Sequence, residues 1–481
     1  MKNSKSKIIY TTIMQEIRMN NRITAQFVLT FFCLAMASKA YGQVLQLDEL
    51  EPYPIKNASL LYPLFEKLIR MEEKKEGKIN IVHIGDSHIQ ADFFTNAVRK
   101  PLQQQFGNGG YGFTFPYSLN RSTTWPYRFS TNVAWQICRN NQPAKCEPGI
   151  EFGLSGYGFS TKAAQFVLSV EVSEEQYRFN TIKIVAPVAA SYRLATIEGN
   201  KKPMIHRVQS GVEIHRIRSG ETLDVIARNY KVSPAAIKRE NNMRTDRIWA
   251  GKKLRIPVTI TETSVDTSIF RPLEYQQQEQ FVSVYRQQNP ISAIYLLQAG
   301  KQSLYSLNGL IVENDAPGVI YHSIGTIGSM ASDFNATPLF FEQLPVLSPD
   351  FVIISFGTNE SYSDVTAEEF ITHMELFINN IRAFCPDVPV LVTTPPTSLL
   401  RRGRLNNYVL EYADALMQRD DVALWDLYSF TGGLMGAKEN FSAIQIAKDY
   451  IHYTSGGYIN QGTAFANAFL NEYKHYKRNH E

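Results

Sequence analysis

The sequence predicts a three-layer α/β/α domain that is interrupted by an all-β insertion. Strand-like apolar runs alternate with amphipathic helical stretches over residues 50–120 and again over 315–478, which is typical of a parallel sheet covered by helices. Residues 121–314 lack this alternation and hold short β-type runs rich in aromatic, Ser, Thr and Gly residues. A chain of 481 residues has room for two or three domains.

The N-terminus has the layout of a secretory signal peptide. Basic and polar residues fill positions 1–23, an apolar run extends from Phe27 to Ala37, and small residues such as Ala40 follow. We expect residues 1–42 to be removed and the protein to be secreted, either periplasmic or at the cell surface. The alternative is an uncleaved N-terminal anchor. No other segment is long and apolar enough for a bilayer span, so no integral membrane association is expected after cleavage.

The first part of the α/β region predicts a helix, a strand and a second helix. From Asn57 onward, apolar residues recur on one helical face. Lys78–Ile84 is a buried strand that ends at Gly85-Asp86-Ser87, and a helix is expected over Ile89–Leu102.

The second part, from about residue 317, continues the alternation. Its expected strands are Val319–Ile324, Phe351–Phe356, Val388–Thr393 and Val422–Leu427. Its expected helices are Thr366–Phe384, which opens with a Thr366/Glu369 capping box, Asn406–Gln418 and Gly462–Tyr476.

The insertion, residues 121–213 and 258–314, predicts a sandwich or jelly roll. Its β-type runs are Ala164–Val172, Thr181–Val185, Ser191–Ile197, Gln280–Val284 and Ile291–Leu297. The aromatic residues Trp125, Tyr127 and Trp135 suit stacking against sugars, but they suit a β core equally well, and the core is the favoured reading for any one of them.

Residues 214–257, inside the insertion, predict a small βααβ unit. A strand runs to Ile217, Thr222 stands in capping position before a first helix, Ile237 lies on a second helix, and Gly251 turns into a closing strand.

This segment resembles a LysM repeat over its whole length. The matching residues are Gly220-Glu221-Thr222-Leu223, Ile226-Ala227, Tyr230, Val232-Ser233, Asn241, Ile248 and Leu254-Arg255-Ile256-Pro257. The resemblance implies binding to peptidoglycan or another N-acetylglucosamine-containing glycan. It places the sugar groove at Gly220, Glu221, Thr222, Leu223, Asn241 and Ile248.

Ser87 is the candidate nucleophile. It follows a strand and precedes a helix, so it lies at the carboxyl edge of the sheet, where open α/β folds bind ligands. Its N–H, at a helix N-terminus, can face a developing oxyanion. Asp449 stands three residues before His452, which lets its carboxylate hold Nδ1–H while Nε2 faces a serine hydroxyl.

Two further segments follow strands and supply hydrogen-bond donors. Asn359, in Gly357-Thr358-Asn359-Glu360, has a side-chain amide, and Gly328, in Gly325-Thr326-Ile327-Gly328, lets its backbone N–H come close to a substrate.

These four segments, in this order, resemble the four blocks of SGNH/GDSL hydrolases, whose fold is a flavodoxin-like three-layer α/β/α domain. The resemblance implies Ser87 as nucleophile, His452 as base and Asp449 as its orienting partner. It implies an oxyanion hole made by the N–H groups of Ser87 and Gly328 and the side chain of Asn359, with Gly325 as the alternative glycine. No cofactor is expected.

The long insertion and the Gly-Thr-Asn-Glu form of the third block are similar to those of bacterial peptidoglycan O-acetylesterases. The implied function is removal of O-acetyl groups from peptidoglycan through an acetyl-enzyme. The alternatives are a peptidoglycan O-acetyltransferase, an acetylesterase for another polysaccharide, and a non-catalytic wall-binding protein; the complete Ser/His/Asp set argues against the last of these.

Other polar residues near these blocks have structural interpretations. His83 and His322 are expected in the core, Glu360 is expected to cap a helix, and Asp426 to fix a loop. His88 is a candidate for lining the site.

Composition excludes few functions. The net charge of +4 comes without a long basic stripe, which argues against a nucleic-acid partner. Cys138 and Cys146 either close a short disulfide loop or are free thiols like Cys385. No His/Cys cluster has metal-ligand spacing, so no metal site is expected.

Overall fold

The computed structural model describes residues 53–480 except 121, 123, 124, 200–202, 219, 220 and 231. The predicted signal peptide, residues 1–42, lies outside the described residues. Among the helices that are described, none combines the length and the apolar character needed to cross a bilayer.

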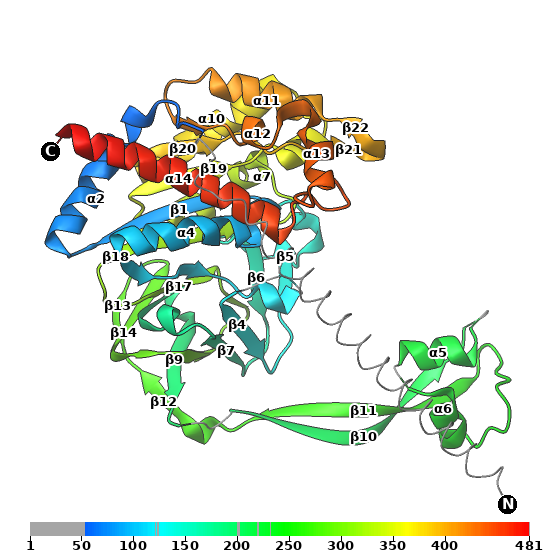
Figure 1. The fold of residues 1–481 in the computed structure, drawn as a ribbon. Helices are drawn as coiled ribbons and strands as arrows, with labels where there is room; N and C mark the ends of the chain where they lie inside the picture. The colour runs from blue at the N-terminus through cyan, green and yellow to red at the C-terminus, as the bar shows by residue number, and fades with distance from the viewer. Residues whose placement is uncertain are drawn as a thin grey trace, which may run out of the picture. The chain divides into compact units, whose positions relative to one another are not determined.

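A six-stranded parallel sheet forms the centre of the α/β domain (Figure 1). Every neighbouring pair of its strands runs parallel, as the alternation of strands and helices predicts. The strand order is β2 (Asn108–Gly110), β18 (Gly318–Gly325), β1 (Lys78–Gly85), β19 (Phe351–Ser355), β20 (Val390–Thr393) and β23 (Ala423–Trp425).

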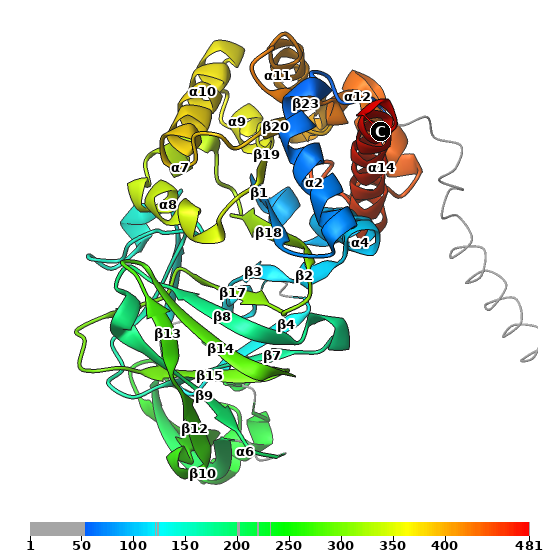
Figure 2. The same cartoon turned by 90° about the vertical axis from the view of Figure 1, so that its left-hand side faces the viewer.

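Helices cover both faces of this sheet (Figure 2). Along β1, Ile79 and Ile81 pack into one apolar cluster and Val82 and Ile84 into another, because successive side chains of a strand point to opposite faces. The first face carries α2 (Tyr62–Lys74), α4 (Phe93–Phe106) and α14 (Ser455–His480). The second face carries α7 (Ala331–Asn335), α8 (Pro338–Gln343), α10 (Ala367–Phe384) and α11 (Asn407–Met417).

The single helix expected over Ile89–Leu102 is wrong. The segment forms α3 (Ser87–Gln90) and α4, which are separated at Asp92. Asp92 adopts a left-handed conformation with φ 57°, which Asp tolerates better than most residues. Its carboxylate accepts hydrogen bonds from the buried Arg99 at 2.8 and 2.9 Å, and this ion pair explains why the chain bends there.

The insertion contains two five-stranded antiparallel sheets, so its β character is confirmed, while the jelly-roll topology stays a prediction. One sheet has the order β13 (Tyr275–Gln278), β14 (Val282–Ile291), β8 (Phe179–Val185), β17 (Gly309–Glu313) and β3 (Gly112–Thr114). Strand β3 precedes residue 121, so this sheet begins before the predicted start of the insertion. The other has the order β12 (Phe270–Leu273), β9 (Tyr192–Ile197), β15 (Ala293–Gln298), β7 (Val167–Val172) and β4 (Tyr127–Thr131).

A third sheet of the insertion is smaller and has three strands. It pairs β16 (Tyr305–Ser306), β6 (Tyr157–Thr161) and β5 (Gln136–Arg139). Residues of all three insertion sheets share one apolar cluster with one face of the parallel sheet. Tyr127 is buried in this cluster and Trp125 and Trp135 pack against it, which supports their core interpretation.

A two-stranded ribbon joins the 214–257 unit to the insertion (Figure 1). Strands β10 (Met204–Arg216) and β11 (Lys253–Val265) pair over 13 positions. The helices α5 (Leu223–Asn229) and α6 (Pro234–Glu240) lie between them in sequence and share a separate small core with the ribbon's outer end. The predicted βααβ order is confirmed, but its strands are longer than expected.

Candidate active site

Ser87 is placed by the end of β1. A Cβ at Gly85 would lie 2.6 Å from the carbonyl oxygen of Ser355 in β19, so only glycine fits where the two strands end. The carboxylate of Asp86 then caps α3 by accepting the N–H of His88 at 2.9 Å. Ser87 is the first residue of that short helix and lies at the carboxyl edge of the sheet.

His452 and Asp449 complete the predicted triad. Ser87 Oγ lies 3.1 Å from His452 Nε2, and His452 Nδ1 lies 2.8 Å from Asp449 Oδ2. The other carboxylate oxygen of Asp449 accepts the backbone N–H groups of Ile451 at 2.9 Å and His452 at 3.0 Å, which fixes the carboxylate within its own loop. The predicted nucleophile, base and orienting carboxylate therefore lie in a chain of two hydrogen bonds.

The triad lies at the protein surface. The side chains of His452 and Asp449 are 45% and 46% exposed. Partial burial raises the pKa of Asp449, but the hydrogen bonds from His452 and the loop N–H groups outweigh this effect and leave its pKa below the ordinary value. The carboxylate is thus charged over the neutral pH range and can stabilise a protonated His452.

Gly328 lies at a tight turn after β18. The N–H of Ser329 donates to the carbonyl of Thr326 at 3.2 Å, and Gly328 has φ 78°, so this turn requires a residue that tolerates a left-handed conformation. Among the described residues, the N–H groups of Ser87 and Gly328 have no hydrogen-bond acceptor. Gly325 instead ends β18, where a Cβ would clash with the backbone of Gln90 at 2.2 Å.

Asn359 connects its own segment with the segments of Ser87 and Gly328 at the edge of the sheet. It lies in α9 (Thr358–Tyr362), and its side-chain amide donates to Asp86 Oδ2 at 3.1 Å and to the carbonyl of Ser329 at 3.0 Å. Because Asp86 precedes Ser87 and Ser329 follows Gly328, these bonds bring the nucleophile and the glycine turn together. Both amide hydrogens are occupied, so an oxyanion-donor role requires one of them to turn toward the substrate.

Glu360 caps α9 and also holds α7. Its two carboxylate oxygens accept the N–H of Gly357 at 2.9 Å and the N–H of Ala331 at 3.0 Å. Burial raises the pKa of Glu360 and of Asp86 to about 7 each, although both accept hydrogen bonds that favour the charged form. The capping interpretation of Glu360 is confirmed.

The remaining polar residues mostly occupy the expected positions. His83 and His322 are fully buried in the core, and Asp426 caps the helix Leu427–Phe430 by accepting the N–H of Ser429 at 3.1 Å. His88 does not face the solvent: it is buried, its Nδ1 lies 2.9 Å from Tyr458 Oη, and its ring stacks on His452 at 5.5 Å. Burial lowers the pKa of His88 to about 3, so it is neutral.

The predicted glycan-binding residues of the 214–257 unit differ in their burial and in their hydrogen-bond partners. Gly220 lies outside the described residues. Leu223 is buried in the small core, and Asn241 binds the backbone of Arg255, with its Oδ1 2.8 Å from the N–H. Those two side chains therefore have structural roles, and their assignment as sugar contacts stays a prediction.

The other three have different surroundings. Glu221 lies 2.8 Å from His215 Nε2, Thr222 caps α5, and Ile248 packs partly against the same core. Trp249, which was not predicted from the sequence, is 65% exposed next to Ile248 and is a further candidate for a glycan contact.

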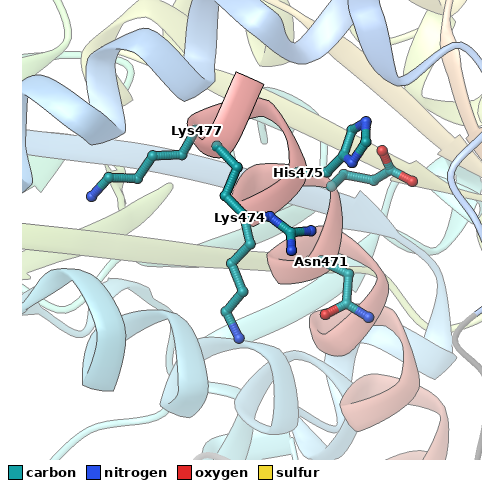
Figure 3. Close-up of a pocket in the computed structure, with 6 residues that line it drawn as sticks. Asn471, Lys474, His475 and Lys477 are labelled. Atoms are coloured by element: carbon teal, nitrogen blue, oxygen red, sulfur yellow. The ribbon is translucent and has the colours of Figure 1, made fainter. Parts of the chain in front are cut away.

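A surface hollow elsewhere contains none of the triad residues. Its described lining consists of α14 side chains, several of them charged (Figure 3). The first of them lies 16 positions after Ser455, the first residue of α14, which is roughly 24 Å along the helix axis at 1.5 Å per residue. Their positions are Asn471, Glu472, Lys474, His475, Lys477 and Arg478. In the described residues, no group of three or more His, Cys, Asp or Glu side chains is placed to hold a metal ion.

Two family models match the chain. The LysM domain model matches residues 215–257, and the model of the GDSL-like lipase/acylhydrolase family matches residues 312–458. The chain thus carries a LysM domain and a GDSL-like acylhydrolase domain, whose enzyme class is that of an esterase. The match to the GDSL-like model contains Gly328, Asn359, Asp449 and His452. Ser87 precedes the insertion and lies outside the matched residues.

Solved structures with related folds include a peptidoglycan O-acetylesterase. It is 18% identical, the alignment covers 88% of this chain and 98% of that one, and the TM-score is 0.54, which shows a shared fold. A lipase/acylhydrolase from Enterococcus faecalis is 21% identical over 32% of this chain and 77% of its own, with a TM-score of 0.25. A carbohydrate esterase family 3 protein from Talaromyces cellulolyticus is 19% identical over 32% and 72%, with a TM-score of 0.26. No curated protein matches the chain.

Proposed function

We propose that this protein is a secreted serine esterase that removes O-acetyl groups from peptidoglycan. Its GDSL-like acylhydrolase domain and its LysM domain support this proposal. The observation that carries the proposal is the assembled triad, in which Ser87 Oγ lies 3.1 Å from His452 Nε2 and His452 Nδ1 lies 2.8 Å from Asp449. A binding protein has no need for this arrangement, which argues against a purely wall-binding role.

In the first half of the proposed reaction, Ser87 attacks the acetyl carbonyl. His452 Nε2 takes the hydroxyl proton, and Oγ forms a bond to the carbonyl carbon as the C=O electron pair moves to oxygen. The N–H groups of Ser87 and Gly328 are available to donate to this oxyanion. When the intermediate collapses, the bond to the sugar oxygen breaks, His452 returns its proton to that oxygen, and an acetyl-enzyme remains.

In the second half, water replaces the sugar. His452 takes a proton from a water molecule, the hydroxide attacks the acetyl carbon, and acetate leaves as Ser87 regains its proton. Asp449 keeps the imidazole oriented and stabilises its protonated form in both halves. These steps need only side chains and backbone N–H groups of this chain and no cofactor.

The surroundings of the triad support a polymeric substrate. Because His452 and Asp449 are nearly half exposed, an acetyl group on a long glycan can reach Ser87 without entering a deep cavity. The LysM domain supplies a second attachment to the same kind of polymer, which raises the local concentration of acetylated sugars. The fold shared with a peptidoglycan O-acetylesterase agrees with this substrate.

Acetate release tests the substrate. The protein without residues 1–42 is incubated with O-acetylated peptidoglycan and, in parallel, with acetylated xylan, with Ser87→Ala as the control. We expect faster release from peptidoglycan and none from the control. Slow release from peptidoglycan with fast release from xylan would make the protein an esterase for another polysaccharide.

A second assay separates hydrolysis from transfer, since an O-acetyltransferase shares the acetyl-enzyme. The protein is given an activated acetyl donor together with de-acetylated peptidoglycan oligomers, and free acetate and oligomer mass are followed. We expect acetate, because water reaches an exposed triad at far higher concentration than any sugar hydroxyl. Acetylated oligomers forming faster than acetate would identify a transferase.

A further inference from the structure

The turn that carries Gly328 is held mainly by residues of the β insertion. Arg139 Nη1 donates to the carbonyl of Ile327 at 3.0 Å, and the side-chain amide of Asn141 donates to the same carbonyl at 3.3 Å. Ser329 Oγ donates to Asn140 Oδ1 at 2.6 Å. Three consecutive residues of the insertion thus bind the residues on both sides of Gly328.

Strand β6 and the turn before it hold the same segment from another side. Thr326 Oγ1 donates to the carbonyl of Ser155 at 3.0 Å, and the N–H of Ile327 donates to Tyr157 Oη at 3.2 Å. A Cβ at Gly156 would lie 2.3 Å from Thr326 Oγ1, so the backbone of Gly156 is in close contact with the Thr326 side chain. The residues flanking Gly328 on both sides therefore bind the insertion, while its own N–H stays without an acceptor among the described residues.

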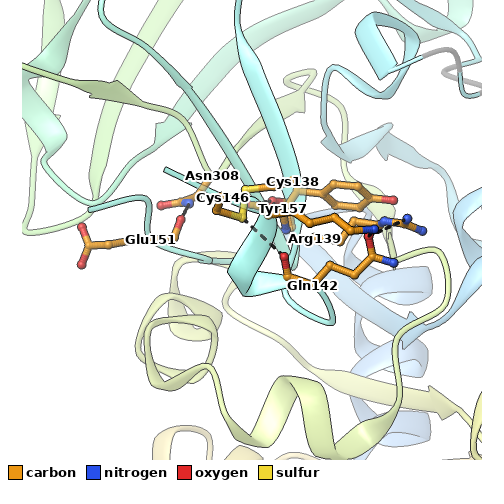
Figure 4. The surroundings of a disulfide bond; sticks show 9 residues. Cys138, Arg139, Gln142, Cys146, Glu151, Tyr157 and Asn308 are labelled. Atoms are coloured by element: carbon orange, nitrogen blue, oxygen red, sulfur yellow. Dashed lines mark hydrogen bonds between the residues drawn. A yellow bond between two sulfur atoms is a disulfide. The ribbon is translucent and has the colours of Figure 1, made fainter. Parts of the chain in front are cut away.

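A disulfide closes the loop that carries these side chains. Cys138 and Cys146 are bonded, which settles the alternative that the sequence left open, and Arg139 follows the first of them (Figure 4). Closing the loop reduces the number of conformations that Arg139, Asn140 and Asn141 can adopt. Asn140 is only 7% exposed.

Arg139 places a positive charge beside Gly328. A Cβ on Gly328 would lie 3.0 Å from Asn141 Nδ2 and 3.8 Å from Arg139 Nη1. Both acceptors of the Arg139 guanidinium are uncharged, the carbonyl of Ile327 and Oε1 of Gln142, so its charge is not neutralised through them. A fixed cation near the site of a developing oxyanion stabilises it.

We propose that the disulfide-closed loop 138–146 of the insertion is part of the catalytic centre. Arg139, Asn140 and Asn141 are positioning residues that fix the Gly328 N–H toward the oxyanion, and Arg139 adds its charge. This inference rests on the proposed esterase function and on Gly328 as an oxyanion donor.

Substitutions in the loop test the positioning role on a soluble acetyl ester. Arg139→Ala and Asn141→Ala should each lower kcat by about 10- to 100-fold and leave KM within about twofold, because the lost interaction acts on the transition state. Arg139→Lys should recover part of kcat. A boronic acid that forms a tetrahedral adduct on Ser87 should bind more weakly in proportion to the loss of kcat.

The matched control is Arg128→Ala, an exposed arginine of the same insertion, which should behave as wild type. Thermal unfolding of each variant shows whether the fold is intact. A folded Arg139→Ala variant with wild-type kcat and boronic acid affinity would overturn the inference. If wild type itself hydrolyses no acetyl ester, the proposed function fails instead.

Reversible reduction tests the disulfide separately. Dithiothreitol transfers two electrons and two protons to Cys138 and Cys146 and becomes a cyclic disulfide. We expect kcat to fall several-fold on reduction, to recover on reoxidation, and to be low and insensitive to dithiothreitol in a Cys138→Ser/Cys146→Ser variant. Cys385→Ser, which changes the free cysteine, should respond as wild type. A reduced, folded enzyme with unchanged kcat would show that the disulfide plays no part in positioning the turn.

Discussion

Ser87, His452 and Asp449 are linked through two hydrogen bonds, and each bond depends on a different pair. Changing any one of them to Ala should therefore remove most hydrolysis of a small acetyl ester, by on the order of 10⁴-fold or more, with Asp449→Ala the mildest. The double and triple variants should lose little beyond the single ones, because the residues act as a unit. Initial rates measure this. Substantial activity in Ser87→Ala would remove Ser87 as the nucleophile.

Asn359 is a proposed oxyanion donor whose side-chain amide also has a structural role. As an oxyanion donor, its loss in Asn359→Ala should cost about 2.7–4 kcal/mol of transition-state stabilisation, seen in kcat. Because the same amide serves Asp86 and Ser329, the variant should also lose about 1–3 kcal/mol of folding stability. Kinetics and chemical unfolding separate the two effects. Lower stability with unchanged kcat would leave Asn359 a purely structural bridge.

Site residues could be predicted from the sequence where their partners are close in sequence or where they lie in a segment that resembles a known family. Asp449 and His452 are three positions apart, and this spacing allows the hydrogen bond that the structure shows between them. Arg139 and Asn141 were not predicted, because their contact with Ile327 joins distant parts of the chain and depends on how the insertion packs against the sheet. The same holds for His88, whose stacking on His452 no local pattern indicates.

At the scale of elements, the apolar runs predicted the parallel strands well, since a strand buried on both faces needs a continuous apolar stretch. The predicted strand Val319–Ile324 corresponds to Gly318–Gly325 in the structure. The helix boundary at Asp92 was missed because a left-handed residue paired with an Arg 7 positions later leaves no periodic pattern in the sequence. The ribbon β10–β11 was underestimated, because its strands are stabilised by pairing with each other along 13 positions.

The ribbon predicts that the LysM domain can be excised. Glu213 pairs with Ile256, so replacing residues 214–255 by Asn-Gly should close a two-residue hairpin turn there. Activity on a soluble ester should stay within about twofold, since the domain has its own core. Co-sedimentation with insoluble peptidoglycan should fall, because the tether is lost.

Trp249→Ala provides the milder comparison, since it leaves the domain in place and changes one exposed aromatic side chain. It should keep ester hydrolysis and lose part of the sedimentation. If the excised variant folds but cannot hydrolyse the soluble ester, the LysM domain belongs to the catalytic machinery and the tether hypothesis is wrong.

At the scale of the whole molecule, buried titratable groups make the free energy of unfolding depend on pH. A substitution of one such group isolates its contribution. Burial raises the pKa of Glu360 from 4.5 to about 7, so between these pH values the folded protein retains a proton that the unfolded chain loses. The contribution of Glu360 to stability is therefore complete below pH 4.5 and declines as pH rises toward 7.

The stability difference between wild type and Glu360→Gln should accordingly shrink with rising pH, by up to about 1.4 kcal/mol per pH unit. Urea unfolding at pH 5, 6 and 7 measures it. Glu368→Gln, at an exposed position of α10, is the control and should show no such trend. A constant difference across this range would mean that Glu360 is ionised throughout.

The position of β1 between β18 and β19 has a consequence for biosynthesis. Both neighbours of this central strand are synthesised only after the entire insertion, so the sheet cannot assemble while the chain emerges as far as residue 317. Contacts this distant in sequence slow folding. A chain stalled at that point would display β1 with both edges unpaired and apolar faces exposed, a template for aggregation. The nascent chain is therefore exposed to aggregation until β19 has been made.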